Sequence, residues 1–176
     1  MVRDDLGPIE AYGDDRRQSQ ISRPGSHEGS MVRVAFVCVE NAGRSQMAAA
    51  FARARAPAWV EVISGGTVPA AEVNRVVIDA MREVGIDLSG QKPARIGPAE
   101  LADCDVVVTM GCSAEDVCPV NFRGDARDWA LPDPKGRTLA DVRRIRDEIE
   151  NRVADLMQEL ALPSGRREDA RKRLGR

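Results

Sequence analysis

The feature of this sequence that most constrains its fold is the alternation of short apolar runs with helical patterns. Apolar runs at residues 33–39, 60–64 and 105–110 have the length of buried strands. The segments expected to be helical are 45–54, 74–84, 98–102 and 139–160. Such alternation predicts an α/β fold, in which a parallel sheet of about four strands carries helices on both faces.

The two ends of the chain differ in composition from this central part. Residues 1–30 are rich in Asp, Arg, Gly, Ser and Pro without apolar periodicity, which predicts a disordered extension. Met31 begins the first strand and is an alternative start of the protein. Residues 163–176 lose periodicity and become basic, which predicts a flexible tail. The 176-residue chain therefore divides into one domain at 31–162 and two tails.

Composition excludes several classes of protein. The net charge of −2 gives no sign of a nucleic-acid-binding surface. No stretch approaches the ~18 apolar residues of a membrane span, and the N-terminus lacks the pattern of a signal peptide. We therefore expect a cytoplasmic protein without nucleic-acid or membrane partners, whose four cysteines stay reduced.

The single histidine, His27, lies in the N-terminal stretch that is predicted not to fold. Its position removes Ser/His and Cys/His dyads, and zinc sites with histidine ligands, from consideration. Acid–base chemistry in the domain must then fall to a carboxylate.

A cysteine ends the first apolar run, and an arginine follows six residues later. Cys38 lies where the predicted strand stops, and Arg44-Ser45 restart the chain as a helix. The helix start supplies N–H groups and a positive dipole end, and the loop amides can form an anion-binding nest. Arg44 can donate two hydrogen bonds to a tetrahedral dianion, and the positive field favours the nucleophilic thiolate form of Cys38. The predicted oxyanion-binding residues are Val39, Glu40, Asn41, Ala42, Gly43, Arg44 and Ser45.

One run resembles the phosphate-binding loop of the low-molecular-weight protein tyrosine phosphatase fold: Cys38-Val39-Glu40-Asn41-Ala42-Gly43-Arg44-Ser45. With its downstream elements, the chain most resembles the arsenate reductases of the thioredoxin-coupled type that share this fold, from about residue 31 to residue 162. The resemblance implies that Asn41 holds the loop in its curled shape and that the Ser45 hydroxyl donates to the Cys38 thiolate. A buried strand-end cysteine is the alternative for Cys38.

Asp133-Pro134 precedes the last predicted helix. The resemblance implies that the Asp133 carboxyl protonates the leaving oxygen, which fits the need for a carboxylate in a domain without histidine. A turn-forming Asp-Pro pair is the alternative. In the tyrosine phosphatases an aromatic residue follows this Asp-Pro and stacks on the substrate ring. Lys135-Gly136 follow here, which weighs against an aryl phosphate substrate.

Two further cysteines, Cys112 and Cys118, follow the third predicted strand. They resemble the relay cysteines of these arsenate reductases, although five residues separate them where six are usual, and Gly111 is an extra residue before them. If 113–118 is helical, roughly 9 Å of rise separates the pair, whereas a disulfide needs Cα atoms within about 7 Å. The disulfide can then form only if this segment unwinds. Two ordinary cysteines are the alternative, and we expect Cys104 to be a packing residue.

The potassium site that the resemblance implies has carboxylates at positions that are Ala49 and Ala94 here, although Asn41 and Ser64 remain. We therefore expect no bound metal ion and no organic cofactor. The expected reductant is an external thiol protein of the thioredoxin type, with glutaredoxin or a small thiol as alternatives.

Together these features predict reduction of arsenate to arsenite, with phosphate as a competitor, by a relay from Cys38 to Cys112 and Cys118. Such an activity would contribute to arsenic detoxification. The first rival is a phosphatase that hydrolyses phosphate monoesters through a cysteinyl-phosphate and needs only Cys38, Arg44 and Asp133. A second rival is a non-enzymatic oxyanion sensor, in which loop binding reshapes the Cys112 segment for a partner.

Overall fold

The computed structural model describes residues 31–162, so the predicted extension 1–30 and tail 163–176 lie outside the described residues. Within this part, parallel strands form one sheet in the order β2-β1-β3-β4. The strands are β1 (Val32–Cys38), β2 (Val60–Gly66), β3 (Val106–Met110) and β4 (Asp125–Asp128). The helices are α1 (Arg44–Arg55), α2 (Arg75–Arg82), α3 (Pro98–Leu101), α4 (Ala114–Val117) and α5 (Leu139–Ala161). The predicted parallel α/β architecture is confirmed.

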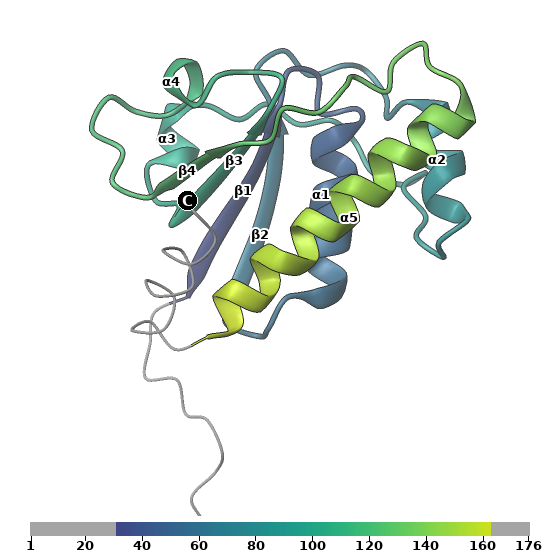
Figure 1. Ribbon diagram of the computed structural model, residues 1–176. Helices are drawn as coiled ribbons and strands as arrows, with labels where there is room; N and C mark the ends of the chain where they lie inside the picture. Colours follow the sequence, from purple (N-terminus) through teal and green to yellow (C-terminus); the bar gives the residue numbers. More distant parts are fainter. Residues whose placement is uncertain (1–30, 163–176) are drawn as a thin grey trace, which may run out of the picture.

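Each face of the sheet carries its own cluster of buried side chains. Val34, Phe36 and Cys38 of β1 belong to the cluster formed with α1, α2 and α5. Ala35 and Val37 belong to the cluster formed with α3 and α4. Figure 1 shows the three longer helices on one side of the sheet and the two short ones on the other. Because helices cover both faces, β1 is apolar and buried at every position from Val34 to Cys38 rather than at alternate positions.

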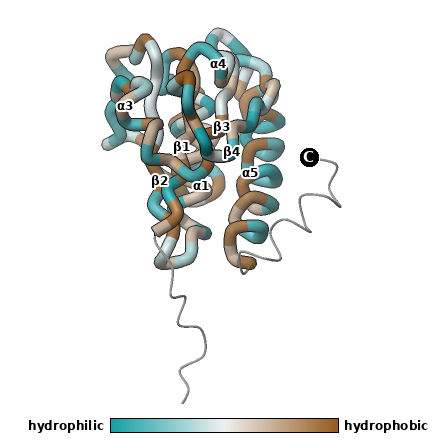
Figure 2. The backbone as a smooth tube through the Cα atoms, turned by 90° about the vertical axis from the view of Figure 1, so that its left-hand side faces the viewer, coloured by the Kyte–Doolittle hydropathy of each residue, from teal (hydrophilic) through white to brown (hydrophobic). Residues whose placement is uncertain are grey.

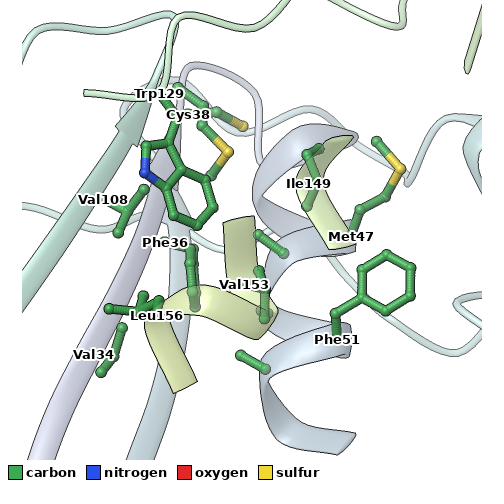
Figure 3. Close-up of a cluster of buried hydrophobic side chains, with 14 of the residues drawn as sticks. Val34, Phe36, Cys38, Met47, Phe51, Val108, Trp129, Ile149, Val153 and Leu156 are labelled. Atoms are coloured by element: carbon green, nitrogen blue, oxygen red, sulfur yellow. The ribbon is translucent and has the colours of Figure 1, made fainter. Parts of the chain in front are cut away.

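The long helix α5 covers the first cluster. Its buried apolar residues recur at helical spacing: Val142, Ile145, Ile149, Val153, Leu156 and Leu160. Figure 3 shows Ile149, Val153 and Leu156 in the same cluster as Met47 and Phe51 of α1. Figure 2 shows the matching alternation of hydrophobic and hydrophilic positions along α5. No helix within residues 31–162 combines the length and the apolar character needed to cross a membrane.

The edge strand β4 was not identified by the sequence analysis, which placed no strand between the apolar run at 105–110 and the helix at 139–160. Its four residues read Asp-Ala-Arg-Asp, so no apolar run marked it. Arg127 is almost fully buried between two carboxylates, Asp125 and Glu159, at N–O distances of 2.6 and 2.8 Å. Tertiary ion pairing and pairing with β3 therefore stabilise a strand that has little apolar signal of its own.

All strands point the same way, so their carboxyl ends lie at one edge of the sheet. The register pairs Cys38 with Gly66 on one side and with Met110 on the other. Figure 1 shows that the loop after β1, the start of α1 and the short helix α4 lie at this same edge. Ligands of open α/β sheets bind beyond these carboxyl ends, so the candidate site is to be found here.

Candidate active site

The loop between β1 and α1 turns its carbonyl groups outward. The carbonyl oxygens of Cys38, Val39, Glu40 and Ala42 accept hydrogen bonds from the N–H groups of Thr67, Val68, Ala70 and Asn74, at 2.9–3.3 Å. In a trans peptide the N–H points opposite to the C=O, so the N–H groups of residues 39, 40, 41 and 43 face the centre of the loop. The loop is therefore an amide nest of the kind that binds anions.

Cys38 lies at the floor of this loop and only 3% of it is exposed. Its Sγ atom is 3.0 Å from the Ser45 Oγ atom and accepts a hydrogen bond from the Asn41 N–H at 3.2 Å. When Cys38 is a thiolate, Ser45 must be the donor, because the sulfur then carries no hydrogen. The N-terminus of the twelve-residue helix α1 starts just beyond, at Arg44. These donors and the helix dipole all favour negative charge on the sulfur.

The Asn41 side chain ties the loop to three other segments. Its Nδ2 group donates to Ser45 Oγ at 2.8 Å and to Ser64 Oγ at 3.4 Å. Its Oδ1 atom accepts from Gln46 Nε2 at 3.1 Å and from the Ala94 N–H at 2.9 Å. Asn41 has a positive φ of 49°, a left-handed conformation that asparagine tolerates better than most residues. This buried amide therefore sets the curl of the loop.

Arg44 lies under the loop that precedes α5, and its side chain is 8% exposed. One terminal nitrogen donates to the Leu131 carbonyl at 2.9 Å, and the other lies 2.7 Å from Asp133 Oδ2. Gly111, with φ of 79°, packs against the guanidinium, since a Cβ there would lie 2.5 Å from it. The glycine that follows β3 thus leaves room for the arginine.

Asp133 reaches the site from a segment 89 residues away from Arg44. Its side chain is 55% exposed, and its Oδ1 atom accepts the Lys135 N–H at 2.9 Å. Pro134 packs directly on Gly43, where a Cβ would come within 2.6 Å of the proline ring. Together these parts line a pocket formed by Cys38, Glu40, Ala42, Gly43, Arg44, Asn74, Asp133, Pro134 and Lys135. The structure thus brings together the predicted nucleophile, the predicted arginine and the predicted acid.

The two other predicted site cysteines lie outside that pocket. Cys112 and Cys118 are half-buried and pack against the cluster on the α3 side of the sheet, whereas Cys38 belongs to the opposite cluster. The Cys112 Sγ atom lies 3.9 Å from the carbonyl oxygen of Val37, the neighbour of Cys38. Burial raises the pKa of the Cys112 thiol and that of the Cys118 thiol. The one-turn helix α4 separates the pair along the chain, and both are free thiols.

The fourth cysteine, Cys104, is 5% exposed and belongs to the cluster on the α3 side. Burial raises the pKa of its thiol to about 11, which makes it a poor nucleophile. Its Sγ atom donates to the Glu100 carbonyl at 3.4 Å. This environment is that of a packing residue, as the sequence analysis expected.

Sequence analysis did not identify three contributors to the site. These are the Gln46 amide, the Leu131 carbonyl and Asn74, which lines the pocket and caps α2. None belongs to a local pattern, so only the folded chain places them. Among residues 31–162, no three His, Cys, Asp or Glu side chains gather in a way that could hold a metal ion. Ala94, one of the two positions where the sequence analysis noted a missing carboxylate, donates its backbone N–H to Asn41 Oδ1 at 2.9 Å.

Comparison with known proteins agrees with this geometry. Residues 33–164 match the family model for low molecular weight phosphotyrosine protein phosphatases. A Halobacterium salinarum protein assigned to the arsenate reductases is 47% identical over 74% of this chain and 94% of its own length. The glutaredoxin arsenate reductase of a Synechocystis species is 35% identical over 74% of this chain and 100% of its own.

A solved structure shares the fold as well. The thioredoxin-dependent arsenate reductase of Corynebacterium glutamicum superposes with a TM-score of 0.62 at 34% identity. The match covers 74% of this chain and 62% of that one, so this chain spans less than two thirds of that structure. From its loop, its sheet and these matches, the chain belongs to the low molecular weight phosphotyrosine protein phosphatase family.

Proposed function

We propose that this protein reduces arsenate to arsenite, with residues 31–162 as the catalytic domain. The observation that carries the proposal is the presence of two additional free thiols, Cys112 and Cys118, directly after the strand that neighbours Cys38. A phosphatase needs only the pocket, whereas a reductase needs thiols that carry oxidation away from it. The Halobacterium and Synechocystis relatives described above carry the name arsenate reductase, which supports this choice.

In the first step, the dianion binds to the loop amides and to the Arg44 guanidinium. The Cys38 sulfur attacks arsenic(V) and forms a sulfur–arsenic bond, while one arsenic–oxygen bond breaks. Protonated Asp133 donates a proton to the departing oxygen, which leaves as water. Because arsenate and phosphate share charge and shape, we expect phosphate to compete for the same nest.

In the second step, Cys112 attacks the Cys38 sulfur. A disulfide forms, and the electron pair of the broken sulfur–arsenic bond goes to arsenic, which becomes arsenic(III) and leaves as arsenite. Cys118 then attacks Cys112, which frees Cys38 and leaves a Cys112–Cys118 disulfide. Since Cys112 packs on the opposite side of the sheet from Cys38, this step requires residues 111–118 to move.

The Cys112–Cys118 disulfide needs two electrons from outside the protein. We propose a thioredoxin-like dithiol protein of the cytoplasm as the donor, because both relay cysteines are already partly exposed and the similar C. glutamicum enzyme is thioredoxin-dependent. The glutaredoxin named in the Synechocystis relative is the alternative donor. The pocket chemistry calls for no resident organic cofactor.

The test is arsenate-dependent NADPH oxidation in the presence of thioredoxin and thioredoxin reductase. The intact chain should turn over many times. Cys118→Ser should stop after about one arsenite per chain, because the Cys38–Cys112 disulfide is then a dead end, whereas Cys112→Ser should release no arsenite. Cys104→Ser is the matched control and should keep multiple turnover.

Hydrolysis of a small aryl phosphate ester tests the rival function with the same variants. Two further variants, Cys38→Ser and Asp133→Asn, complete the set. A phosphatase would lose ester hydrolysis in these two variants and would keep it in Cys112→Ser and Cys118→Ser. If the chain hydrolyses the ester rapidly and adding arsenate does not increase the rate of NADPH oxidation, the proposed reduction is wrong.

A further inference from the structure

A second ion pair crosses the mouth of the pocket, outside the contact between Arg44 and Asp133. Lys135 Nζ lies 2.6 Å from Glu40 Oε1, and the two residues are 95 positions apart in the chain. The Lys135 side chain is 68% exposed and that of Glu40 is 36% exposed. The pair therefore joins the outer rim of the nucleophile loop to the segment that carries the acid.

This pair is the outermost of three attachments between the same two segments. Asp133 pairs with Arg44 at 2.7 Å, and Pro134 packs on Gly43 with no room for a Cβ. Those two attachments involve the reacting pocket itself. The ion pair lies farther out, and both of its members line the pocket.

We propose that the Lys135–Glu40 pair is a specificity-determining closure, which admits a free tetraoxo dianion and disfavours the organic group of a phosphate monoester. The inference rests on the oxyanion site of the proposed function. Free arsenate loses only a water molecule, so no part of it needs to extend through the mouth of the pocket. The organic group of an ester extends outward from the oxygen that leaves, into the space that this pair spans.

The expected effect is modest because the pair is exposed to solvent. Surface ion pairs of this type shift an equilibrium by about two- to fivefold. Lys135 also adds positive charge at the mouth, which attracts any dianion, and Glu40 repels it. These electrostatic effects are equal for a free anion and for an anion of the same charge that carries an organic group. The ratio of the affinities for these two anions therefore measures the effect of the closure alone.

The experiment measures protection of Cys38 against alkylation by iodoacetamide, with peptide mass spectrometry to read Cys38 alone. The two probes are inorganic phosphate and phenylphosphonate, at mildly alkaline pH, where both are dianions. Lys135→Met should weaken phosphate protection and Glu40→Gln should strengthen it. Both variants should shift the affinity ratio toward phenylphosphonate by about two- to fivefold, because both open the mouth.

The double variant should shift the ratio no further than either single variant, because one pair is broken in each case. Arg152→Gln is the control, since it removes another exposed ion pair, with Glu148 at 2.7 Å on α5, and should leave the ratio unchanged. An unchanged ratio in both single variants, or additive shifts in the double variant, would overturn the closure. Failure of phosphate to protect the intact chain would overturn the oxyanion site and the closure with it.

Discussion

At the scale of single residues, Asn41 does most to shape the site. Its amide makes four hydrogen bonds, to Ser45, Ser64, Gln46 and the Ala94 N–H, while its backbone holds a positive φ. The side chain is 1% exposed, so water cannot replace these partners in the folded state. Loop shape and local stability therefore depend on the same residue.

Asn41→Ala should lower the free energy of unfolding by about 1–3 kcal/mol, because it leaves buried polar partners unsatisfied. Asn41→Gly removes the same side chain but accommodates the positive φ, so it should be less destabilising than the alanine variant by about 1 kcal/mol. Urea unfolding of both variants provides the measurement. Equal stability of the alanine variant and the unaltered chain would contradict the role assigned to Asn41.

A second residue-scale prediction concerns pH. Burial raises the pKa of the Cys112 thiol, and a hydrogen bond with the Met110 backbone and the Arg44 charge offset this only in part. Below its pKa, a thiol gains about tenfold in thiolate for each pH unit. The alkylation rate of Cys112 should therefore still increase with pH in the range where the rate of an ordinary cysteine has become constant. Peptide mass spectrometry after timed iodoacetamide treatment measures this rate. A plateau near the ordinary thiol pKa would show that Cys112 is not desolvated.

At the scale of elements, the segment after β3 is the part of the site best suited to change shape. The helix α4 has only four residues, begins at a Ser113 cap and ends before Cys118. Such a short helix has little stability of its own, because one turn gains few hydrogen bonds for the residues it orders. A helix over 113–118 was considered in the sequence analysis only as a condition; the observed helix spans Ala114–Val117 and is short enough to unwind at low cost.

Oxidation of the Cys112–Cys118 pair should therefore unwind α4. We expect limited proteolysis to cut residues 111–119 at least several times faster in the oxidised chain than in the reduced one, because proteases act on unfolded segments. A Cys112→Ser variant treated with the same oxidant is the control, since it cannot form this disulfide. Identical cleavage rates in both redox states would show that no local unfolding accompanies disulfide formation.

At the scale of the whole molecule, the site exists because several chain segments meet at one edge of the sheet. The loop after β1, the segment after β3 and the segment before α5 come together there (Figure 1). Figure 3 shows Cys38 and Trp129 at one end of the core cluster, next to Phe36, so the same packing supports Cys38 and the chain that leads toward Asp133. Loss of the sheet order would separate all of these parts.

Anion binding should therefore stabilise the whole fold. Phosphate at one hundred times its dissociation constant should raise the free energy of unfolding by about 2.7 kcal/mol. Arg44→Lys should reduce this phosphate-dependent increase, because a lysine cannot donate in the forked geometry. Thermal unfolding at increasing phosphate measures both, with chloride at matched ionic strength as the control. If phosphate stabilises the Arg44→Lys variant and the unaltered chain equally, Arg44 does not bind the anion.

Local sequence patterns were enough to predict the main elements and the loop between β1 and α1. Strand, loop and helix succeed each other from residue 33 to residue 54, and helix periodicity marked α5 within one residue of its observed end. These features depend on neighbours along the chain, through backbone hydrogen bonding and burial of one helix face or both sheet faces. The polar strand β4 had no such pattern, and its position depends on pairing with β3 and on the ion pairs of Arg127.

The sequence by itself determined which chemical groups this protein has: a strand-end thiol, an arginine at a helix start, an Asp-Pro carboxyl and two later cysteines. Only the tertiary structure decided which of them meet. It places Asp133 on Arg44 and Lys135 on Glu40, and it puts Cys112 on the other side of the sheet from Cys38. The reason is that contacts between segments about 90 residues apart depend on strand order and register, which no local pattern specifies.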